Sequence, residues 1–139
     1  MKIIVAIDDD NGMLFNKRRQ SQDTVLREYI LAMTKDTILW MNEYTRKQFS
    51  DVPAYVRVSE KPMDEAGDGE YCFVEDMGVA AFEDKIEEMI VFRWNRKYPS
   101  DLQLDYNPLE RGMILTRSED FKGTSHDKIT VEVWKKDGI

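Results

Sequence analysis

The sequence has only one cysteine, Cys72, and only one histidine, His126, in 139 residues. With one cysteine the chain cannot form an intramolecular disulfide or a cluster of thiolate ligands, and the apolar neighbours of Cys72 favour a buried structural thiol. Zinc and di-metal hydrolases usually need two or three imidazole or thiolate ligands, so both scarcities argue against that class and against a bound metal. His126 stands beside Ser125 and Asp127, but adjacent side chains rarely face one another as a triad, which favours an ordinary turn histidine.

The sequence also lacks any run of about 18 or more apolar residues, which excludes a membrane-spanning helix of the usual kind. Met1 and Lys2 lead directly into a strand-like segment rather than into the charged and apolar regions of a secretion signal. We therefore expect a soluble, cytoplasmic protein that does not bind a membrane. Its length predicts a single domain over residues 1–139, and no repeat, linker or low-complexity segment divides it.

Positive charge is in short supply, since 27 acidic residues outweigh 20 basic ones and give a net charge of −7. This balance disfavours nucleic acid and anionic membranes as partners and leaves a basic protein open. Residues 17–19, Lys-Arg-Arg, are a local exception. The simplest interpretation of this cluster is a solvated loop.

Short apolar runs rich in Val, Ile and aromatic residues recur along the first two thirds of the chain and predict strands at residues 2–7, 37–41, 55–58, 71–74 and 90–94. Helical patterns lie between them at residues 23–33, 43–49 and 79–89, and polar stretches at 62–70 and 98–108 predict loops. Alternating strands and helices indicate an α/β domain with a mostly parallel sheet.

The last third changes style, because residues 112–117 and 128–134 alternate apolar and polar positions. They predict an antiparallel hairpin with a long connection over residues 118–127. Trp40, Trp94 and Trp134 fall in strand patterns, which favours packing in the core or on a sheet face over a stacking platform for a ligand.

The order of these elements, together with the amino-acid sequence of several short segments, resembles that of the dihydrofolate reductase family over nearly the whole chain. The segments that carry the resemblance are Ile3-Ile4-Val5-Ala6-Ile7-Asp8 with Asn11-Gly12-Met13-Leu14, Leu39 to Thr45, Val56 to Glu60, Phe73 to Phe82, Ile90 to Trp94, Gly112 to Arg117, and Lys128 to Lys135. The resemblance implies a mostly parallel central sheet of about seven strands with flanking helices and a C-terminal antiparallel hairpin. The strand and helix that the family places just before its double glycine have no counterpart here.

The resemblance also implies a reaction, in which NADPH supplies hydride and an acidic residue early in the first helix assists protonation of the pterin. Asp23 matches that acidic residue and is the candidate catalytic group. A second interpretation is open, since aspartate is a favoured helix cap and Asp23 precedes Val25 and Leu26. Residues 17–20 replace the proline-tryptophan pair with which the family covers the nicotinamide.

The family's phosphate contacts fall on positions that this sequence has changed. Asn42 replaces a glycine and Glu43 a basic residue, while Thr45 matches the family's threonine. Ser59 matches a serine that the family follows with a basic residue, but here Glu60 follows, with Lys61 next.

The third phosphate contact is the double glycine, which Glu75 and Asp76 replace, with Gly78 close by. Their side chains would block the close backbone approach that a phosphate needs, and their charge would oppose it. An aspartate at a helix start is also a good cap, which explains the turn without a ligand.

These changes act against one ligand group, and each charge reversal beside a partly buried phosphate costs on the order of 1 to 3 kcal/mol. We therefore predict no NADPH in the usual pose and no other cofactor. The favoured hypothesis is a degenerate, non-catalytic module that binds a small molecule or a protein.

Two alternatives stay open. One is an NAD(P)H-dependent reductase of a pterin or similar heterocycle, an oxidoreductase in which residues 17–19 or Lys61 replace the lost contacts. The other is an acidic, immunity-type inhibitor of a basic protein.

Overall fold

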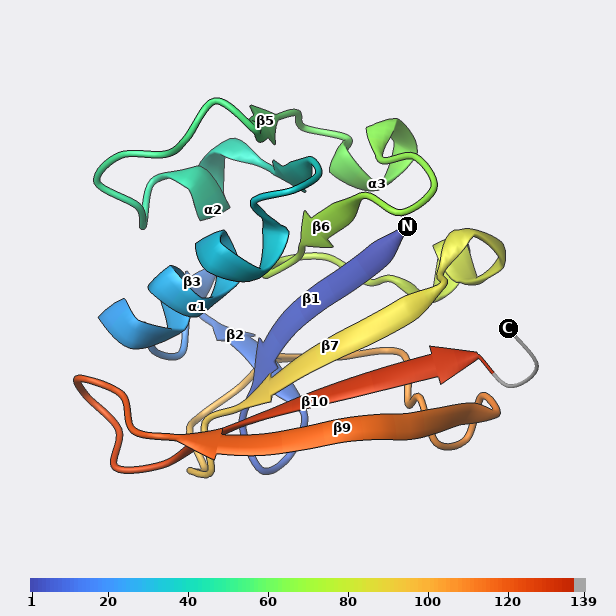
Figure 1. Ribbon diagram of the computed structural model, residues 1–139. Coiled ribbons are helices and arrows are strands. Elements are labelled where there is room, and N and C mark those ends of the chain that lie inside the picture. Colours follow the sequence, from blue (N-terminus) through green and yellow to red (C-terminus); the bar gives the residue numbers. More distant parts are fainter. Residues whose placement is uncertain (137–139) are drawn as a thin grey trace.

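A computed structural model describes residues 1–136, and Figure 1 shows their arrangement. The strands are β1 (Lys2–Ile7), β2 (Gly12–Phe15), β3 (Arg18–Arg19), β4 (Leu39–Met41), β5 (Val56–Val58), β6 (Tyr71–Phe73), β7 (Glu88–Arg93), β8 (Leu102–Gln103), β9 (Met113–Phe121) and β10 (Ile129–Lys136). The helices are α1 (Thr24–Thr34), α2 (Glu43–Arg46), α3 (Pro62–Glu65) and the 3-10 helix η1 (Ala80–Lys85). None of these helices has the length and apolar character to cross a bilayer.

The main sheet has seven strands in the order β5-β4-β6-β1-β7-β10-β9. The first five are parallel to one another, and β10 pairs antiparallel with both β7 and β9. The predicted α/β fold, with a mostly parallel sheet and a C-terminal antiparallel hairpin, is therefore confirmed. The chain returns to place β6 between β4 and β1, so successive crossovers leave this point in opposite directions, which is where α/β sheets open a crevice for ligands.

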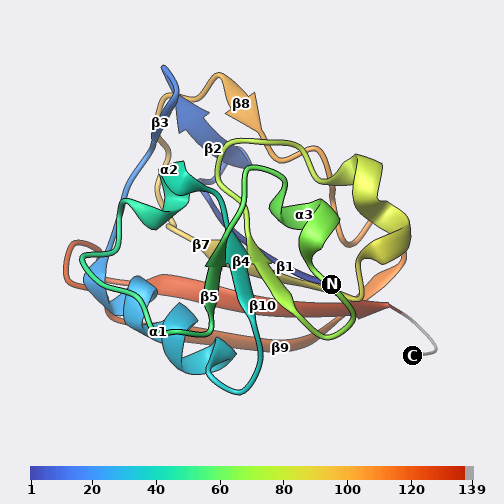
Figure 2. The same cartoon turned by 90° about the horizontal axis from the view of Figure 1, so that it is seen from above.

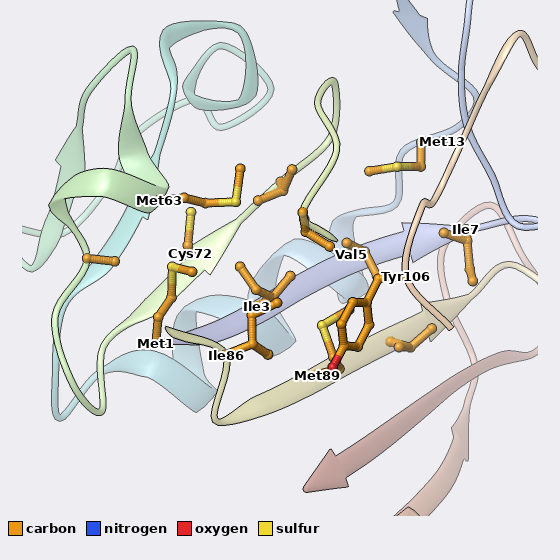
Figure 3. Close-up of a cluster of buried hydrophobic side chains, with 14 of the residues drawn as sticks. Met1, Ile3, Val5, Ile7, Met13, Met63, Cys72, Ile86, Met89 and Tyr106 are labelled. Atoms are coloured by element: carbon orange, nitrogen blue, oxygen red, sulfur yellow. The ribbon is translucent and has the colours of Figure 1, made fainter. Parts of the chain in front are cut away.

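Two apolar cores lie on opposite faces of this sheet, which explains why its central strands are almost continuously apolar. In β1, Ile3 and Val5 belong to one core and Ile4 to the other, and all three are fully buried. Figure 3 shows the first core, where Cys72 lies beside Met1 and Met63. Burial raises the pKa of the Cys72 thiol to about 12, so the predicted structural thiol is confirmed.

A second, smaller sheet of β3, β2 and β8 is absent from the sequence prediction. Its hairpin turns over Asn16 and Lys17, whose φ angles of 52° and 61° are the left-handed values that a two-residue hairpin turn needs. β3 lies next to α2, since the Arg19 backbone N–H donates to the Tyr44 hydroxyl at 2.6 Å (Figure 2). Strands of two to four residues with charged tips leave too short an alternation to recognise in a sequence.

Several predicted boundaries were wrong. The expected helix over residues 79–89 is only η1, because β7 already begins at Glu88, where it pairs with Lys2 of β1. The expected helix over residues 43–49 is only α2, and the loop over residues 62–70 contains α3. The hairpin connection is shorter than predicted, since β9 continues to Phe121 with polar, exposed residues.

Candidate functional site

The carboxyl ends of β4, β5 and β6 bring the three predicted phosphate positions together. The Asn42 side-chain amide donates a hydrogen bond to Asp76 Oδ1 at 2.9 Å. The Glu43 backbone N–H donates to Glu60 Oε2 at 3.0 Å. This end of the sheet, which we call the acidic edge, is thus lined by the carboxylates of Glu60 and Asp76, as the residue types at these positions predict, and these carboxylates themselves make the contacts.

The N-terminus of α2 already has acceptors for its backbone N–H groups. Asn42 is its N-cap, with Oδ1 accepting from the Thr45 N–H at 3.0 Å and the backbone carbonyl from Arg46 at 2.9 Å. The Glu60 carboxylate takes the N–H of Glu43. Thr45 is buried, and within the described residues its hydroxyl oxygen has no hydrogen-bond partner. Side chains of the chain itself therefore occupy the positions where a helix start binds an anion.

A carboxylate also occupies the start of η1, and no local pattern in the sequence had singled it out. Asp105 accepts hydrogen bonds from the backbone N–H of Val79 at 2.8 Å and of Ala80 at 3.2 Å. Gly78, predicted to lie beside a cofactor, packs against this carboxylate so closely that an added Cβ would stand 2.4 Å from Asp105 Oδ2. Here the glycine makes room for Asp105.

Arg19 forms an ion pair at the acidic edge. Its Nε and Nη2 atoms donate to the two carboxylate oxygens of Glu75 at 3.0 and 3.1 Å, and Nη2 also donates to the Tyr44 carbonyl at 3.1 Å. The guanidinium lies over the Tyr44 ring, 4.4 Å from its centroid, and the Arg19 N–H donates to the Tyr44 hydroxyl at 2.6 Å. The Arg19 and Glu75 side chains are only 19% and 9% exposed. One member of the cluster predicted to be a solvated loop is therefore a half-buried ion pair.

Asp23 is the N-cap of α1, and the residue is 2% exposed. It accepts from the N–H groups of Val25 and Leu26 in its own helix, from those of Thr124 and Ser125 in the hairpin connection, and from the Ser125 hydroxyl, at 2.8 to 3.3 Å. The capping interpretation is what the structure shows.

The environment of Asp23 also fixes its charge. Burial alone would raise the pKa of Asp23, but the hydrogen-bond donors of Ser125, Thr124 and Leu26 outweigh it and hold that pKa well below the ordinary value. The carboxylate therefore stays ionised at neutral pH and has no proton to supply. Beyond its own helix, its contacts are to the hairpin connection, whereas the acidic edge lies at the carboxyl ends of β4, β5 and β6.

His126 lies in the hairpin connection, where an ordinary turn histidine was predicted, but it is buried and only 4% exposed. Its ring stacks on Trp94 with centroids 4.6 Å apart. Nε2 lies 2.9 Å from the Tyr98 hydroxyl and 3.3 Å from Ser21 Oγ, and Nδ1 lies 2.9 Å from Ser125 Oγ. Tyr98 and Ser21 are 28 and 105 residues away in the chain, so no local signal could have indicated this network.

The contact between the hairpin connection and Asp23 depends on a glycine. A Cβ added at Gly123 would lie 2.3 Å from Asp23 Oδ2. Gly123→Ala is therefore expected to push the connection off the carboxylate and to lower the free energy of unfolding by about 2 kcal/mol in urea titration. Gly67→Ala is the matched control, because its new Cβ would meet Glu70 at an ordinary 3.5 Å. Equal stability of the two variants would contradict this expectation.

Asp8, which follows β1, organises a second part of the site. It is buried and accepts from the backbone N–H groups of Gly12, Asp10 and Tyr98 at 2.7 to 3.0 Å and from the Gln20 side-chain amide at 3.1 Å. Burial would raise the pKa of Asp8, but the N–H donors, that of Tyr98 first, hold it below its usual value. One ionised carboxylate thus ties the β2–β3 hairpin to the segment after β7.

A pocket of about 510 Å³ lies between these two segments. It is lined by Phe15, Asn16, Arg18, Arg19, Gln20, Tyr98 and Pro99. None of these residues is acidic, which distinguishes the pocket from the acidic edge at the ends of β4 to β6.

Comparison with known proteins finds a similar structure but no similar sequence. No protein-family model matches the sequence, and no curated protein sequence matches it. Among solved structures, a dihydrofolate reductase from Enterococcus faecalis, complexed with NADP(H) and RAB-propyl, superposes with a TM-score of 0.65 over 98% of this chain and 95% of that chain. This chain has a dihydrofolate reductase-like fold. The resemblance read from the order of elements is confirmed at that level, and the sequence identity of 10% extends it no further.

In a dihydrofolate reductase-like fold the predicted site residues divide into three places. Asn42, Thr45 and the carboxylates of Glu43, Glu60, Glu75 and Asp76 gather at the carboxyl ends of β4 to β6, with Ser59 at the end of β5. Gly78 lies against Asp105, and Asp23 lies at the hairpin connection. Arg19, Asp105, His126 and Asp8 are the neighbours of these sites that sequence reasoning missed or misread.

Proposed function

We propose that this chain is a non-catalytic ligand-binding module with a dihydrofolate reductase-like fold and that it uses no nicotinamide cofactor. One observation carries the proposal: carboxylates of the chain itself bind the backbone N–H groups at the starts of both α2 and η1. The similar protein from Enterococcus faecalis was solved with NADP(H). In this chain Glu60 and Asp105 hold the groups that an incoming phosphate would need.

The negative charge of the acidic edge also supports the absence of a nicotinamide cofactor. A phosphate would have to displace Glu60 from the Glu43 N–H and then lie close to Asp76 and Glu75. Displacing a charge-assisted hydrogen bond and adding a like charge nearby each cost on the order of 1 to 3 kcal/mol, so together they weaken binding by several powers of ten. Arg19 offers no compensation, because Glu75 already takes two of its N–H groups.

Asp23 is also poorly suited to supply the proton of a reductase reaction. A general acid needs a pKa near the working pH and a position within reach of the substrate. The Asp23 carboxylate is held ionised and is engaged by donors from α1 and the hairpin connection. We therefore assign Asp23 a structural role in this module.

The test is a titration of the purified chain with NADPH, NADH and dihydrofolate, followed by nucleotide fluorescence and thermal stability. We expect no saturable change in fluorescence and a shift in Tm of less than about 1 °C at millimolar ligand, because mass action stabilises only the state that binds. Micromolar binding of NADPH, or dihydrofolate-dependent oxidation of NADPH, would overturn the proposal in favour of a reductase.

A charge variant shows whether the carboxylates are the cause. In Glu43→Lys/Glu60→Ser the acceptor at the start of α2 is lost and the charge beside it is reversed. This variant is expected to bind NADPH at least tenfold more tightly than the parent chain. Glu110→Lys/Asp68→Ser, at two exposed turn residues, is the control for net charge, because it raises the charge by the same amount.

A further inference from the structure

We propose that the pocket between the β2–β3 hairpin and the segment after β7 binds a small aromatic anion, a one- or two-ring carboxylate or phosphate. Arg18 pairs with the anionic group, and Phe15 and Tyr98 flank the ring. This inference rests on the proposed ligand-binding function and names the ligand class and the site. It gives a role to the basic cluster at residues 17–19, of which only Arg19 contacts the acidic edge, through Glu75.

The hairpin directs two side chains into this pocket. Phe15 and Arg18 are directly opposed across the two-residue turn, so their side chains leave the hairpin on the same face, and both line the pocket. In the neighbouring pair, Leu14 is buried, and Arg19 also lines the pocket but is bound to Glu75. The ion pair with Glu75 thus distinguishes a structural arginine from an available one.

The charge of the pocket selects an anion. Its lining contains two arginines and no carboxylate. Arg19 is neutralised by Glu75, whereas Arg18 is exposed and forms no ion pair with any residue in 1–136. Asp101 accepts from the Asn16 N–H at 3.0 Å but does not line the pocket. In a chain of net charge −7, an unpaired guanidinium is a distinct site for a carboxylate or phosphate, which it can bind through two N–H donors.

The apolar part of the lining selects a ring. Phe15 is 41% exposed, Tyr98 is half-buried and Pro99 lies next to it, so the walls offer flat apolar surface beside the cation. A volume of about 510 Å³ falls within the range of small-molecule sites and accommodates one or two fused rings. Aromatic faces and a nearby guanidinium together bind a planar anion better than either alone.

The walls are held before a ligand arrives. Tyr98 donates its backbone N–H to Asp8, and its hydroxyl lies 2.9 Å from His126 Nε2. On the opposite wall, the Gln20 amide donates both to Asp8 and to the Pro99 carbonyl. Because the two walls share the buried Asp8, little ordering is left for binding to accomplish.

The experiment titrates ¹⁵N-labelled chain with indole-3-acetate and with adenosine 5′-monophosphate, which separates a carboxylate from a phosphate ligand. The neutral compounds indole-3-acetamide and adenosine are the matched probes. We expect at least one anion to bind with a submillimolar Kd, to shift the amide signals of Phe15, Arg18 and Tyr98, and to bind about tenfold more tightly than its neutral counterpart.

Two variants assign the contact. Arg18→Gln is expected to reduce the affinity for the anion to that for the neutral probe, whereas Lys17→Gln, at the adjacent turn residue outside the pocket lining, is expected to change it less than twofold. Both residues are exposed, so both variants should fold, as circular dichroism will check. Absence of binding by both anions, equal affinity for charged and neutral probes, or equal effects of the two variants would each overturn the inference.

Its failure can be told apart from failure of the proposed function. A chain that binds neither NADPH nor the two anions refutes this inference alone. A chain that oxidises NADPH and also binds an anion against Tyr98 refutes the proposed function and supports the pocket. Shifts confined to the amides of Glu43 and Thr45 would place the anion at the acidic edge and refute binding in the pocket.

Discussion

Replacing Asp23 with alanine is expected to lower the free energy of unfolding by about 3 to 5 kcal/mol and Tm by about 10 to 15 °C. The variant removes the cap of α1 and leaves the backbone N–H groups of Thr124 and Ser125 without their acceptor. Hydrogen bonds to an ionised, buried acceptor are the strong ones, and unmet donors carry a desolvation cost. Urea titration and calorimetry measure both quantities.

Glu28→Ala is the matched control, because Glu28 is an exposed residue of the same helix. We expect it to change stability by less than about 0.5 kcal/mol. Asp23→Asn should fall between the two variants, since the amide keeps one acceptor oxygen but places a donor among donors. An Asp23→Ala variant within about 1 kcal/mol of the parent chain would show that the hairpin connection finds other partners.

The same carboxylate makes stability depend on pH. Its folded-state pKa lies below the ordinary aspartate value of about 3.9, so protonation favours the unfolded chain. The stabilisation is therefore fully present above about pH 5 and is lost as the pH falls through 4 and below. We expect the stability difference between the parent chain and Asp23→Asn to be largest near pH 7 and to shrink by pH 3.

Breaking the Arg19 and Glu75 ion pair is expected to have the next largest effect. Arg19→Met should cost about 2 to 4 kcal/mol, because it leaves the Glu75 carboxylate, 9% exposed, without a partner. The double variant Arg19→Met/Glu75→Gln should recover at least about 1 kcal/mol of that loss, since a neutral amide is less costly to bury than an unpaired charge. Denaturant titration of the single and double variants gives the coupling energy directly.

An exposed pair provides the comparison. Arg111 and Glu83 lie 2.9 Å apart with side chains 42% and 40% exposed, and Arg111→Met should cost about 1 kcal/mol or less. If Arg19→Met lowers stability as little as Arg111→Met does, water reaches Glu75 and the Arg19 ion pair contributes no more than an exposed one. A double variant less stable than Arg19→Met would contradict the expectation that the unpaired Glu75 charge carries the cost.

The sequence was sufficient for those parts of the fold that depend on local patterns. The central parallel strands are buried on both faces, so each appears as a short apolar run, and Asp23 precedes an apolar stripe as helix caps do. The exposed, polar end of β9 gave no such signal, so this strand was predicted too short. The strands of the small sheet around β2 have only two to four residues and were missed.

The candidate site was predictable in its chemistry but not in its pairing. The carboxylates of Glu60 and Glu75 were recognised as opponents of a phosphate, yet nothing local showed that one would bind the Glu43 N–H and the other Arg19. Arg19 and Glu75 are 56 residues apart, and Asp105 lies 26 residues from the Val79 N–H that it accepts. Contacts at such separations depend on the finished topology, which residue types alone do not reveal.

Tyr98 touches both buried carboxylate networks, through its N–H to Asp8 and through its hydroxyl to His126, whose neighbour Ser125 binds Asp23. A ligand that packs against this ring therefore stabilises an arrangement that extends to the first turn of α1. Thermodynamic linkage makes the relation mutual: whatever loosens the helix cap weakens binding at the distant pocket, and occupancy of the pocket protects the cap. Occupancy would thus be reported at the far end of the network, where the hairpin connection meets the helix.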